Sequence, residues 1–380
     1  MKPERDPRPL PWDDLASVVI GVGDAWEALR GARVFVTGGT GFFGRWMVES
    51  LLAAHAMRGI DAEIVVLTRD PEAFAAAVPH VAGHPSVRLH AGDVRTFDYP
   101  LGGYSHVLHM ASYESRSESP TASSRTAIEG MERVLDFAAT RGVRDLLFTS
   151  SGAIYGPQPS DLASIPEEYI GSPRIRSGLS AVADDYADGK RAAEVLCFAA
   201  SDGGRVAVKI ARCFAFVGPL LPLDSHFAIG NFIGDVLSGS VVVIKSDGTT
   251  RRSYLYAADL AIWLWTILIR GRAGYPYNVG SADDLSIFDL AQRIVAILDP
   301  VLPIRIDAAP QRGTAPTRYV PSTARAEAEL GLSSRVDLDE GIRRMARWHV
   351  ESNQSSGPHG HDGLSCRDGD RINGARNQCE

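Results

Sequence analysis

The chain contains a tyrosine and a lysine at a spacing suited to proton transfer. The segment YADGK places Tyr186 and Lys190 four residues apart in a stretch whose pattern predicts a helix, and residues at that spacing lie on one helix face. A neighbouring ammonium group favours tyrosinate and so lowers the phenol pKa from its ordinary value of about 10. Such a phenol can act as a general base toward a sugar or alcohol hydroxyl. The pair is common by itself, so its meaning depends on other motifs.

A glycine-rich turn lies far upstream, in the segment VFVTGGTGFFGRW. Gly38 would permit a tight exit from a strand, Gly41 would let the backbone approach a pyrophosphate, and Gly44 would let the next helix pack closely. The N–H groups at the start of that helix, around Phe42 and Phe43, would then bind the phosphates. Because the turn joins a predicted strand to a predicted helix, we interpret it as a dinucleotide-binding site.

The end of the second predicted strand, VVLTRDP, leaves the choice of dinucleotide open. An acid usually grips the ribose of NAD at this point, but Thr68 and Arg69 occupy it. Arg69, together with Arg45, could neutralise the 2′-phosphate of NADP. Alternatively, Arg69 stacks on the adenine while Asp70 or backbone groups bind the ribose. NAD and NADP are both compatible with this segment.

Two further strand ends would lie beside the cofactor. In AGDV, Asp93 and Val94 could clamp the edge of the adenine. The segment HMAS ends the next strand, where Ala111 would contact the cofactor and Ser112 the substrate. His109 in the same segment is explained at least as well by a place in the core.

The order of elements predicts an α/β fold. Short runs rich in Val, Ile and Leu alternate with helical patterns over 44–57, 121–141 and 186–200, which is typical of a Rossmann-like, doubly wound parallel sheet. A smaller mixed α/β lobe would cover the carboxyl edge of the sheet, where such folds bind ligands. We expect an N-terminal extension with one helix over 1–30, a dinucleotide-binding domain over 31–215 with a return segment at about 252–283, mainly a substrate-binding lobe over 216–350, and a disordered tail over 351–380.

Composition excludes several classes of protein. The net charge is -7, with 39 Lys and Arg against 46 Asp and Glu, so nucleic acid is not an expected partner. No apolar run approaches the roughly 20 residues of a membrane helix, and the first residues lack a signal core. We therefore expect a cytoplasmic protein that is not bound to a membrane. No metal site is predicted, and the four cysteines show no CxxC pair and are interpreted as buried or free thiols: Cys197, Cys213, Cys366 and Cys379.

Taken together, the motifs resemble those of the extended short-chain dehydrogenase/reductase family, in its NAD-dependent sugar-nucleotide epimerase/dehydratase branch. The resemblance covers about 32–332 and rests on motifs in the family's order: TGGTGFFG, GDV, HMAS, SSGAIYG, YADGK, RCFAFVGP, RRSYLYAADL and YNVG. It implies a nucleoside-diphosphate sugar as substrate. It also implies a homodimer formed by the two long helices predicted over 121–141 and 186–200.

The resemblance assigns roles to individual residues. Tyr186 would be the catalytic base and acid, and Lys190 its electrostatic partner and a clamp on the nicotinamide ribose. Ser151, four residues before Tyr155, would hydrogen-bond the reacting oxygen of the substrate. Arg252 in RRSY would grip the nucleotide diphosphate, and Arg318 in APTRYVP is a weaker match for a second such arginine. Arginines suit a diphosphate, although either of these two could also be a plain surface charge.

The residues after Ser151 bear on which reaction follows. Family enzymes all begin by removing a hydroxyl proton and a hydride from one sugar carbon, which leaves a ketone. Dehydratases carry acidic residues directly after the serine or threonine, because elimination of water needs an acid and a base. Sugar-acid decarboxylases also usually keep a carboxylate in that stretch, whereas simple 4-epimerases have small residues. This chain has Gly152 and Ala153 there, although Glu114 in a nearby loop could supply a carboxylate.

We therefore predict a 4-epimerase that recycles its own nicotinamide cofactor. A 4-ketoreductase consuming NADPH is the nearest alternative, followed by a 4,6-dehydratase. A non-catalytic dinucleotide-binding protein is the alternative from a different class. Ala215 stands where the family commonly has an asparagine that touches the substrate, which suggests a shifted diphosphate or an unusual sugar. Asn231 could compensate for this loss or could simply lie on a helix surface.

Overall fold

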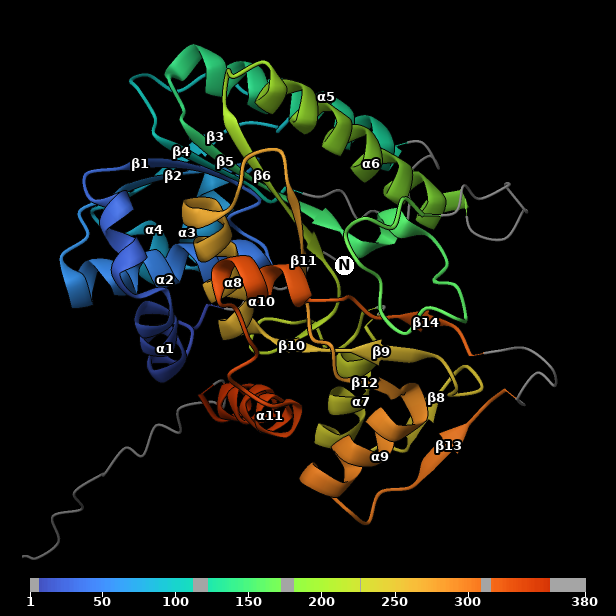
Figure 1. Ribbon diagram of the computed structural model, residues 1–380. Helices are drawn as coiled ribbons and strands as arrows, with labels where there is room; N and C mark the ends of the chain where they lie inside the picture. Colours follow the sequence, from blue (N-terminus) through green and yellow to red (C-terminus); the bar gives the residue numbers. More distant parts are fainter. Residues whose placement is uncertain (1–6, 112–121, 172–180, 226, 309–315, 356–380) are drawn as a thin grey trace, which may run out of the picture.

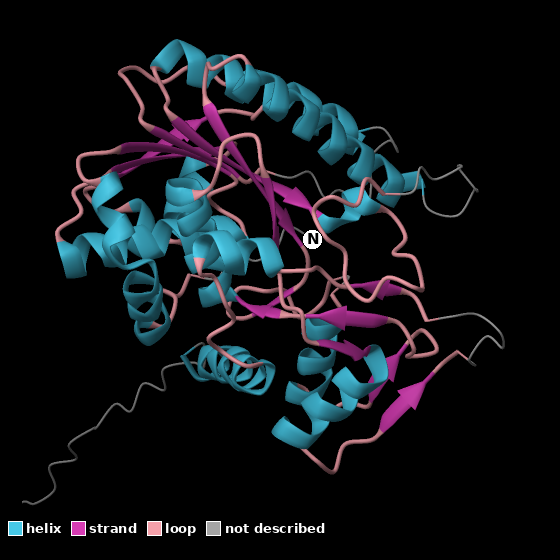
Figure 2. Cartoon of the chain, in the orientation of Figure 1, coloured by secondary structure: helices cyan, strands magenta, loops and turns pink. Residues whose placement is uncertain are grey.

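A seven-stranded parallel sheet forms the centre of the molecule in the computed structural model (Figure 1). The structure describes residues 7–111, 122–171, 181–225, 227–308 and 316–355. All neighbouring strands in this sheet are parallel, and helices cover both faces (Figure 2). The predicted Rossmann-like, doubly wound fold is confirmed. The strands, from one edge to the other, are β3 (Val87–Ala91), β2 (Glu63–Thr68), β1 (Arg33–Thr37), β4 (His106–His109), β5 (Asp145–Ser151), β6 (Ala207–Cys213) and β11 (Pro276–Val279).

The alternation of side chains in β1 separates the two halves of the core. Val34 and Val36 belong to one hydrophobic cluster, whereas Phe35 between them belongs to another, because successive strand residues point to opposite faces. The Phe35 face is covered by two long helices that pack side by side (Figure 1), α5 (Ala122–Arg141) and α6 (Ala181–Asp202). The opposite face is covered by α1 (Trp12–Val22), α2 (Phe42–Arg58), α3 (Pro71–Ala77), α4 (Pro79–Ala82) and α8 (Ala257–Arg270).

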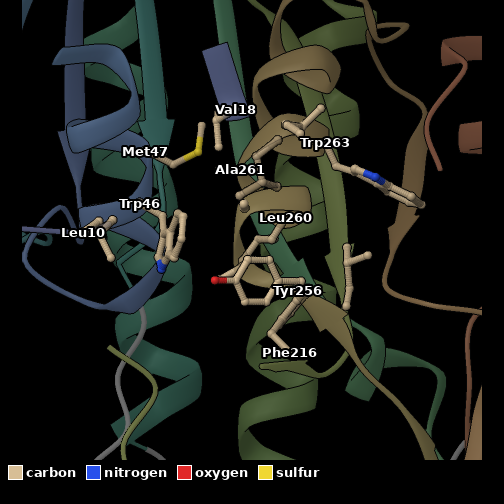
Figure 3. Close-up of a cluster of buried hydrophobic side chains, with 14 of the residues drawn as sticks. Leu10, Val18, Trp46, Met47, Phe216, Tyr256, Leu260, Ala261 and Trp263 are labelled. Atoms are coloured by element: carbon tan, nitrogen blue, oxygen red, sulfur yellow. The ribbon is translucent and has the colours of Figure 1, made fainter. Parts of the chain in front are cut away.

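The N-terminal extension packs against α2 and α8. The sequence predicts one helix over 12–30, but α1 ends at Val22 and a 3₁₀ helix, η1 (Gly23–Leu29), follows. The reason is Gly23, whose φ of 60° is incompatible with continuing the α-helix. Figure 3 shows Leu10 and Val18 packed with Trp46, Met47 and residues of α8. The extension is therefore part of the main hydrophobic core.

A smaller lobe lies beyond the carboxyl ends of β5 and β6 (Figure 1). Its strands form three small sheets: β10 (Leu255–Tyr256) with β7 (Phe216–Val217), β12 (Asp284–Ser286) with β9 (Arg251–Ser253) and β14 (Arg318–Tyr319), and β13 (Ile304–Ile306) with β8 (Val242–Ile244). Helices α7 (Ala228–Leu237) and α9 (Ile287–Leu298) pack on one another in this lobe. The remaining helices are η2 (Gly152–Tyr155), α10 (Ala324–Leu330) and α11 (Leu338–Ser355).

Elements from different parts of the chain meet in this arrangement. Strand β11 joins the main sheet beside β6, although residues of the small lobe precede and follow it.

Helix α11 continues to Ser355, into the segment 351–380 for which the sequence predicts disorder. The domain boundaries stay predictions, and residues from 356 onward lie outside the described part. Within the described residues, no helix has both the length and the apolar character needed to cross a membrane.

Candidate active site

The glycine turn connects β1 to α2 at the carboxyl edge of the sheet. Gly38 has a φ of 71°, in the left-handed region that disfavours other residues. A Cβ atom there would lie 2.6 Å from the backbone nitrogen of Ala111, so β4 and the turn can approach only because Gly38 has no side chain. A Cβ atom at Gly44 would overlap the carbonyl oxygen of Gly38. Both glycines therefore allow the close packing of helix, turn and strand.

Gly41 differs from these two glycines because a Cβ atom at its position would have room. The atom nearest to a Cβ built there is the Gly38 carbonyl oxygen, at 3.6 Å. Gly41 is the N-cap of α2 and provides no side-chain cap, so the first N–H groups of the helix, at Phe42 and Phe43, have no partner within the helix. Open space and unpaired N–H groups at a helix N-terminus suit the pyrophosphate of a dinucleotide.

The residues expected at the adenosine of the cofactor carry both positive and negative charges. Arg69 is exposed at the end of β2, while Asp70 caps α3 by accepting from the Ala73 N–H at 2.9 Å. Arg95 forms an ion pair with Asp93 at 2.8 Å, and the hydrogen bond from Arg95, with a smaller contribution from Arg69, holds the Asp93 pKa below its usual range. Arg69 is thus close enough to Asp93 for their charges to interact.

Arg45 does not join Arg69. Its buried guanidinium forms an ion pair with Glu49 at 2.5 Å and donates to the carbonyl oxygen of Arg8 at 2.7 Å. The proposed help of Arg45 in neutralising a 2′-phosphate is therefore wrong. Because the N-terminal extension supplies a partner for this arginine, the side chain is part of the core packing.

The tyrosine and lysine of the YADGK motif line one pocket together with residues at the carboxyl ends of β4 and β5. Lys190 is buried, its Nζ donates to the Thr149 carbonyl at 2.8 Å, and the same nitrogen lies 5.8 Å from the ring centre of Tyr186. The lysine is thereby fixed between α6 and β5, next to the phenol. The pocket is lined by Val94, His109, Ala111, Ser123, Thr126, Ala127, Phe148, Tyr186 and Lys190.

Two other titratable groups beside Lys190 are kept neutral. Burial, assisted by the charge of Lys190, lowers the pKa of His109 to about 3, and its Nδ1 lies 2.7 Å from the Thr37 hydroxyl. Burial raises the pKa of the Cys213 thiol to about 12. His109 is therefore a neutral core residue, and Cys213 is a buried free thiol as the sequence predicts.

Ser151 lies at the end of β5, where it begins η2. Its hydroxyl accepts from the Ala153 N–H at 3.1 Å. The phenol of Tyr319 in β14 lies near Gly152, with its oxygen 2.7 Å from a Cβ atom built at that glycine, and burial raises its pKa well above the usual value, with smaller effects from Ser151 and Tyr186. Ser151 and Tyr186 therefore share a neighbour, and Gly152, next in the chain, brings no side chain to this point.

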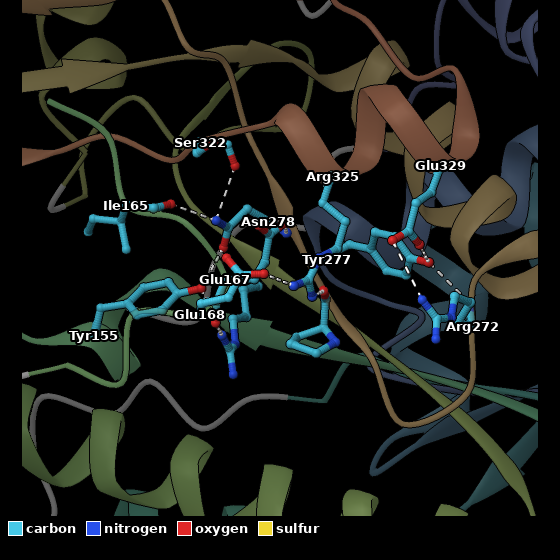
Figure 4. A network of polar contacts seen from close by, with 12 residues as sticks. Tyr155, Ile165, Glu167, Glu168, Arg272, Tyr277, Asn278, Ser322, Arg325 and Glu329 are labelled. Atoms are coloured by element: carbon cyan, nitrogen blue, oxygen red, sulfur yellow. Dashed lines mark hydrogen bonds and ion pairs between the residues drawn. The ribbon is translucent and has the colours of Figure 1, made fainter.

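A buried polar network lies around Arg212, and Figure 4 shows Tyr155, Glu167 and Asn278, which belong to it. Arg212 in β6 contacts the Glu194 carboxylate with N–O distances of 2.8 to 3.2 Å and donates to the Tyr155 hydroxyl at 2.8 Å. Tyr155 in turn donates to the Asn278 amide oxygen at 2.8 Å, and the Asn278 N–H donates to Glu167 at 2.9 Å. These residues tie α6, η2, β6 and β11 together.

Sequence reasoning missed the roles of these network residues. Arg212 and Asn278 do lie within the motifs RCFAFVGP and YNVG, and Glu194 follows Lys190 by four residues on the same helix. That spacing was the available signal for Glu194. No local pattern, however, indicates that Arg212 and Glu194 pair.

The two arginines expected at the diphosphate do not come together. Strand β14 pairs with β9 so that Arg318 lies opposite Arg251 and Tyr319 opposite Arg252. Residues opposite one another project to the same face and neighbours along a strand alternate, so Arg318 and Arg252 project to opposite faces. Arg318 forms an ion pair at 2.9 Å with Asp284, which Arg251 also contacts. Only Arg252 lies on the face of Tyr319, 5.3 Å from its ring centre.

The remaining predicted substrate residues are less closely tied to this site. Asn231 lies half-buried in α7, where its backbone N–H donates to the Phe227 carbonyl. The Ala215 carbonyl accepts from the Leu255 N–H at 3.0 Å, which links the end of β6 to the small lobe. Ser112 and Glu114 lie outside the described residues. Within the described residues, no group of three or more His, Cys, Asp and Glu is placed to hold a metal ion.

Comparison with known proteins gives matches over most of the chain. The model of the "NAD dependent epimerase/dehydratase family" matches residues 34–280. The chain is 28% identical over 316 residues to UDP-glucuronic acid decarboxylase 1 of Arabidopsis thaliana, covering 82% of this chain and 68% of that protein. Among solved structures, DesIV, the dTDP-glucose 4,6-dehydratase from Streptomyces venezuelae with NAD and TYD bound, has a TM-score of 0.70 at 25% identity, covering 85% and 98% of the two chains.

An epimerase shares the same fold. UDP-glucose 4-epimerase from Thermotoga maritima, solved with UDP-glucose, has a TM-score of 0.68 at 18% identity, covering 84% of this chain and 99% of that chain. The similar proteins thus include a decarboxylase, a dehydratase and an epimerase, and the fold does not choose among their reactions.

Proposed function

Because the chain belongs to the NAD dependent epimerase/dehydratase family, we propose that it modifies a nucleoside-diphosphate sugar through a transient 4-keto sugar and acts as a 4-epimerase. The proteins similar to this chain include sugar-nucleotide epimerases, dehydratases and decarboxylases. The choice of epimerisation rests on the residues around Ser151.

The observation that supports epimerisation is the absence of a free carboxylate beside Ser151 among the described residues. Gly152 and Ala153 occupy the positions of the dehydratase acids. The buried carboxylates nearest in the network are already engaged, since Glu194 pairs with Arg212 and Glu167 accepts from the Asn278 N–H. A site with hydroxyl groups but no acid can take a proton and return it, yet it is poorly equipped to expel water.

The side chains divide this chemistry among them. Tyr186 takes the proton of the sugar 4-hydroxyl, and the ammonium of Lys190 stabilises the negative charge near it. Ser151 hydrogen-bonds the reacting oxygen. NAD held at the turn of Gly38, Gly41 and Gly44 would supply reversible hydride transfer with the sugar carbon. Arg252, half-buried beside the site, binds the diphosphate.

NAD is the cofactor of this family and is bound in DesIV. The turn formed by Gly38, Gly41 and Gly44 fits its pyrophosphate. Asp93 lies close enough to Arg69 to offset part of its charge, which disfavours the 2′-phosphate of NADP. We therefore expect tighter binding of NAD than of NADP.

The other predicted contacts are part of the proposal. Ser112 and Asn231 would contact the substrate, and Arg318 could reach a diphosphate only by leaving Asp284. We also propose a cytoplasmic homodimer formed through α5 and α6, whose outer faces lie on the surface of the chain (Figure 1).

Decarboxylation of a UDP-hexuronic acid is the second candidate. It is favoured by the similarity to UDP-glucuronic acid decarboxylase 1 over 82% of this chain. A 4-keto hexuronic acid is a β-keto acid, which can lose carbon dioxide without an additional acid group in the site. The small residues Gly152 and Ala153 therefore argue less strongly against a decarboxylase than against a dehydratase.

The test is mass spectrometry of products from UDP-glucose, UDP-N-acetylglucosamine, UDP-glucuronic acid and dTDP-glucose, incubated with purified protein without added cofactor. A product of unchanged mass with a new retention time would support the 4-epimerase. Loss of carbon dioxide would establish the decarboxylase, and loss of water would establish the dehydratase. Turnover only after NADPH is added would identify a 4-ketoreductase instead.

A further inference from the structure

Helices α5 and α6 meet at Ser124, close to the N-terminal end of each. The carboxylate of Asp185 in α6 lies at the start of α5, where one of its oxygens accepts from the backbone N–H groups of Ser123 and Ser124, both at 3.0 Å. The other oxygen accepts from the Ser124 hydroxyl at 2.5 Å. Three donors from a single turn of α5 therefore bind this one carboxylate.

These contacts make Asp185 a helix cap that a neighbouring helix supplies. The first N–H groups of an α-helix have no partner within that helix, and because α5 begins at Ala122, Ser123 and Ser124 carry two of them. A carboxylate suits this place because it accepts hydrogen bonds and because negative charge is favourable at a helix N-terminus. The cap therefore ties α6 to α5 in a defined direction.

Gly189 brings the two helices together at the same residue. It follows Asp185 by four positions, so the two lie on one face of α6. A Cβ atom at Gly189 would lie only 2.6 Å from the Cα atom of Ser124 and 3.2 Å from the Cβ atom of Ala127. The lack of a side chain at Gly189 therefore lets α6 approach α5 closely enough for Asp185 to reach the N–H groups.

The next residues in the chain after these two are Tyr186 and Lys190. Successive residues of an α-helix are rotated by about 100° around its axis, so the contact of Asp185 and Gly189 with α5 also sets the direction of this pair. Both side chains line the pocket, and residues of the first turns of α5 line it with them. Lys190 is held in addition by the Thr149 carbonyl. The contact with α5 thus determines how Tyr186 faces the pocket.

We propose that Asp185 is a positioning residue: by capping α5 it fixes the rotation of α6 and so holds the Tyr186 phenol toward the reacting hydroxyl of the sugar. This inference rests on the proposed function, since Tyr186 is the base of that reaction. Asp185 acts through Tyr186 rather than on the sugar itself. The role requires a hydrogen-bond acceptor at position 185, whereas a negative charge beside Tyr186 is not needed for it.

Two neutral substitutions separate the hydrogen bonds of Asp185 from its charge. The amide oxygen in Asp185→Asn has two lone pairs and can accept from both N–H groups, while the amide nitrogen can donate to the Ser124 hydroxyl oxygen. Asparagine is also as good a helix cap as aspartate. Asp185→Ala removes the acceptor but loses the same charge, so a difference between the two variants reports the cap alone.

The matched control is Asp337→Ala. It removes a carboxylate that caps another helix, α11, by accepting from the Glu340 N–H at 2.8 Å. Among the described residues, α11 supplies none to the lining of the pocket. The control therefore measures what the loss of a helix cap does to the protein as a whole.

Each variant is assayed with whichever nucleotide sugar of the panel the wild type converts. We expect Asp185→Ala to lower kcat at least about tenfold, because a displacement of about 1 Å can cost about 100-fold, while KM and the Kd for NAD change by less than about threefold. Asp185→Asn should keep a kcat close to that of the wild type. Asp337→Ala should lower the melting temperature as much as Asp185→Ala does but leave kcat unchanged.

Crystal structures of the two variants of Asp185 with NAD bound give a second measurement, which needs no sugar. In the wild type the Lys190 Nζ lies 5.8 Å from the ring centre of Tyr186. Asp185→Asn should keep this arrangement. In Asp185→Ala we expect α6 to turn away from Ser124 and the phenol to move from its place beside Lys190.

An unchanged kcat in Asp185→Ala, or equal losses of kcat in the alanine and asparagine variants, would overturn the positioning role. A similar loss of kcat in Asp337→Ala would overturn it too, because the effect would then be one of general stability. So would a crystal structure of Asp185→Ala in which Tyr186 has not moved. If the wild type converts none of the four sugars, the proposed function fails, and the two crystal structures still decide whether Asp185 holds Tyr186 in place.

Discussion

The Arg212 guanidinium holds the Glu194 carboxylate at N–O distances of 2.8 to 3.2 Å and, with another nitrogen, donates to the Tyr155 hydroxyl. Glu194 lies one helical turn after Lys190 in α6, whereas Tyr155 ends the η2 segment that begins next to Ser151. This one arginine therefore sets the distance between the helix that carries the catalytic pair and the turn that carries the serine.

Glu194→Ala should be strongly destabilising, because it leaves Arg212 charged and unpaired in the interior. Loss of one partner of a buried ion pair typically costs about 3–5 kcal/mol. We expect a lower midpoint of urea denaturation. Glu27→Ala, which breaks an exposed pair with Arg30, is the matched control and should leave the midpoint nearly unchanged. Equal midpoints for both variants would contradict the supporting role of Glu194.

Tyr186→Phe separates an enzyme from a protein that only binds a dinucleotide. The change removes the group that takes the sugar proton but keeps the ring, so kcat should fall by about 10²- to 10⁴-fold. NAD binding, measured by calorimetry, should survive. Full activity in this variant would show that another group is the base.

Gly41→Ala should affect NAD binding without affecting the fold. A Cβ atom has room in the protein itself, with its nearest neighbour at 3.6 Å, but it would project into the space assigned to the pyrophosphate. We expect at least a tenfold weaker Kd for NAD, or about 1.4 kcal/mol, and an unchanged melting temperature without NAD. Gly44→Ala is the contrasting variant. It should lower the melting temperature even without NAD, because its Cβ atom overlaps the Gly38 carbonyl oxygen.

Two buried histidines predict how stability depends on pH. Burial lowers the pKa of His106 from 6.5 to about 4 and that of His109 from 6.5 to about 3. Between pH 6.5 and these values the unfolded chain binds more protons than the folded chain, so the free energy of unfolding must fall as the pH falls. The slope should reach about 1.4 kcal/mol per pH unit for each histidine.

Urea denaturation at several pH values between about 4.5 and 7.5 measures this slope, because histidines titrate over about that range. His106→Gln should show a shallower slope than the wild type. The free energy of unfolding should depend little on these histidines above about pH 7, where they are neutral in both states. Identical slopes for the two proteins would mean that other groups cause the acid sensitivity.

The proposed dimer can be tested at Val195, an apolar residue of α6 that is 65% exposed in the single chain. Val195→Glu would bury a charge in an interface formed by α5 and α6, which is costly unless the charge is paired. Sedimentation should show a dimer for the wild type and a monomer for this variant. Ile20 lies on the exposed side of α1 and is 68% exposed. The Ile20→Glu variant should therefore remain a dimer. A monomeric wild type would end the dimer proposal.

The sequence alone was sufficient for features that depend on neighbours in the chain. The glycine spacing, the strand before it and the helix after it predicted the phosphate-binding turn. The interval between Tyr186 and Lys190 predicted their common helix face. Gly23, which ends α1, is also a local signal, but the apolar pattern across 12–30 led to the prediction of one continuous helix. These features could be predicted because helix periodicity and φ preferences act over a few residues.

The rest depended on which distant segments meet. Arg252 and, as a weaker match, Arg318 were both expected at the diphosphate, and only the pairing of β14 with β9 decided that they project to opposite faces. Tyr319 gave no signal of its own, yet the packing of the small lobe places its hydroxyl beside Gly152, far away in the chain. Likewise, Arg45 could be excluded only once Glu49 and the N-terminal extension were seen to enclose it. Strand register and lobe packing are set by the sum of many long-range contacts, so no short pattern of residues records them.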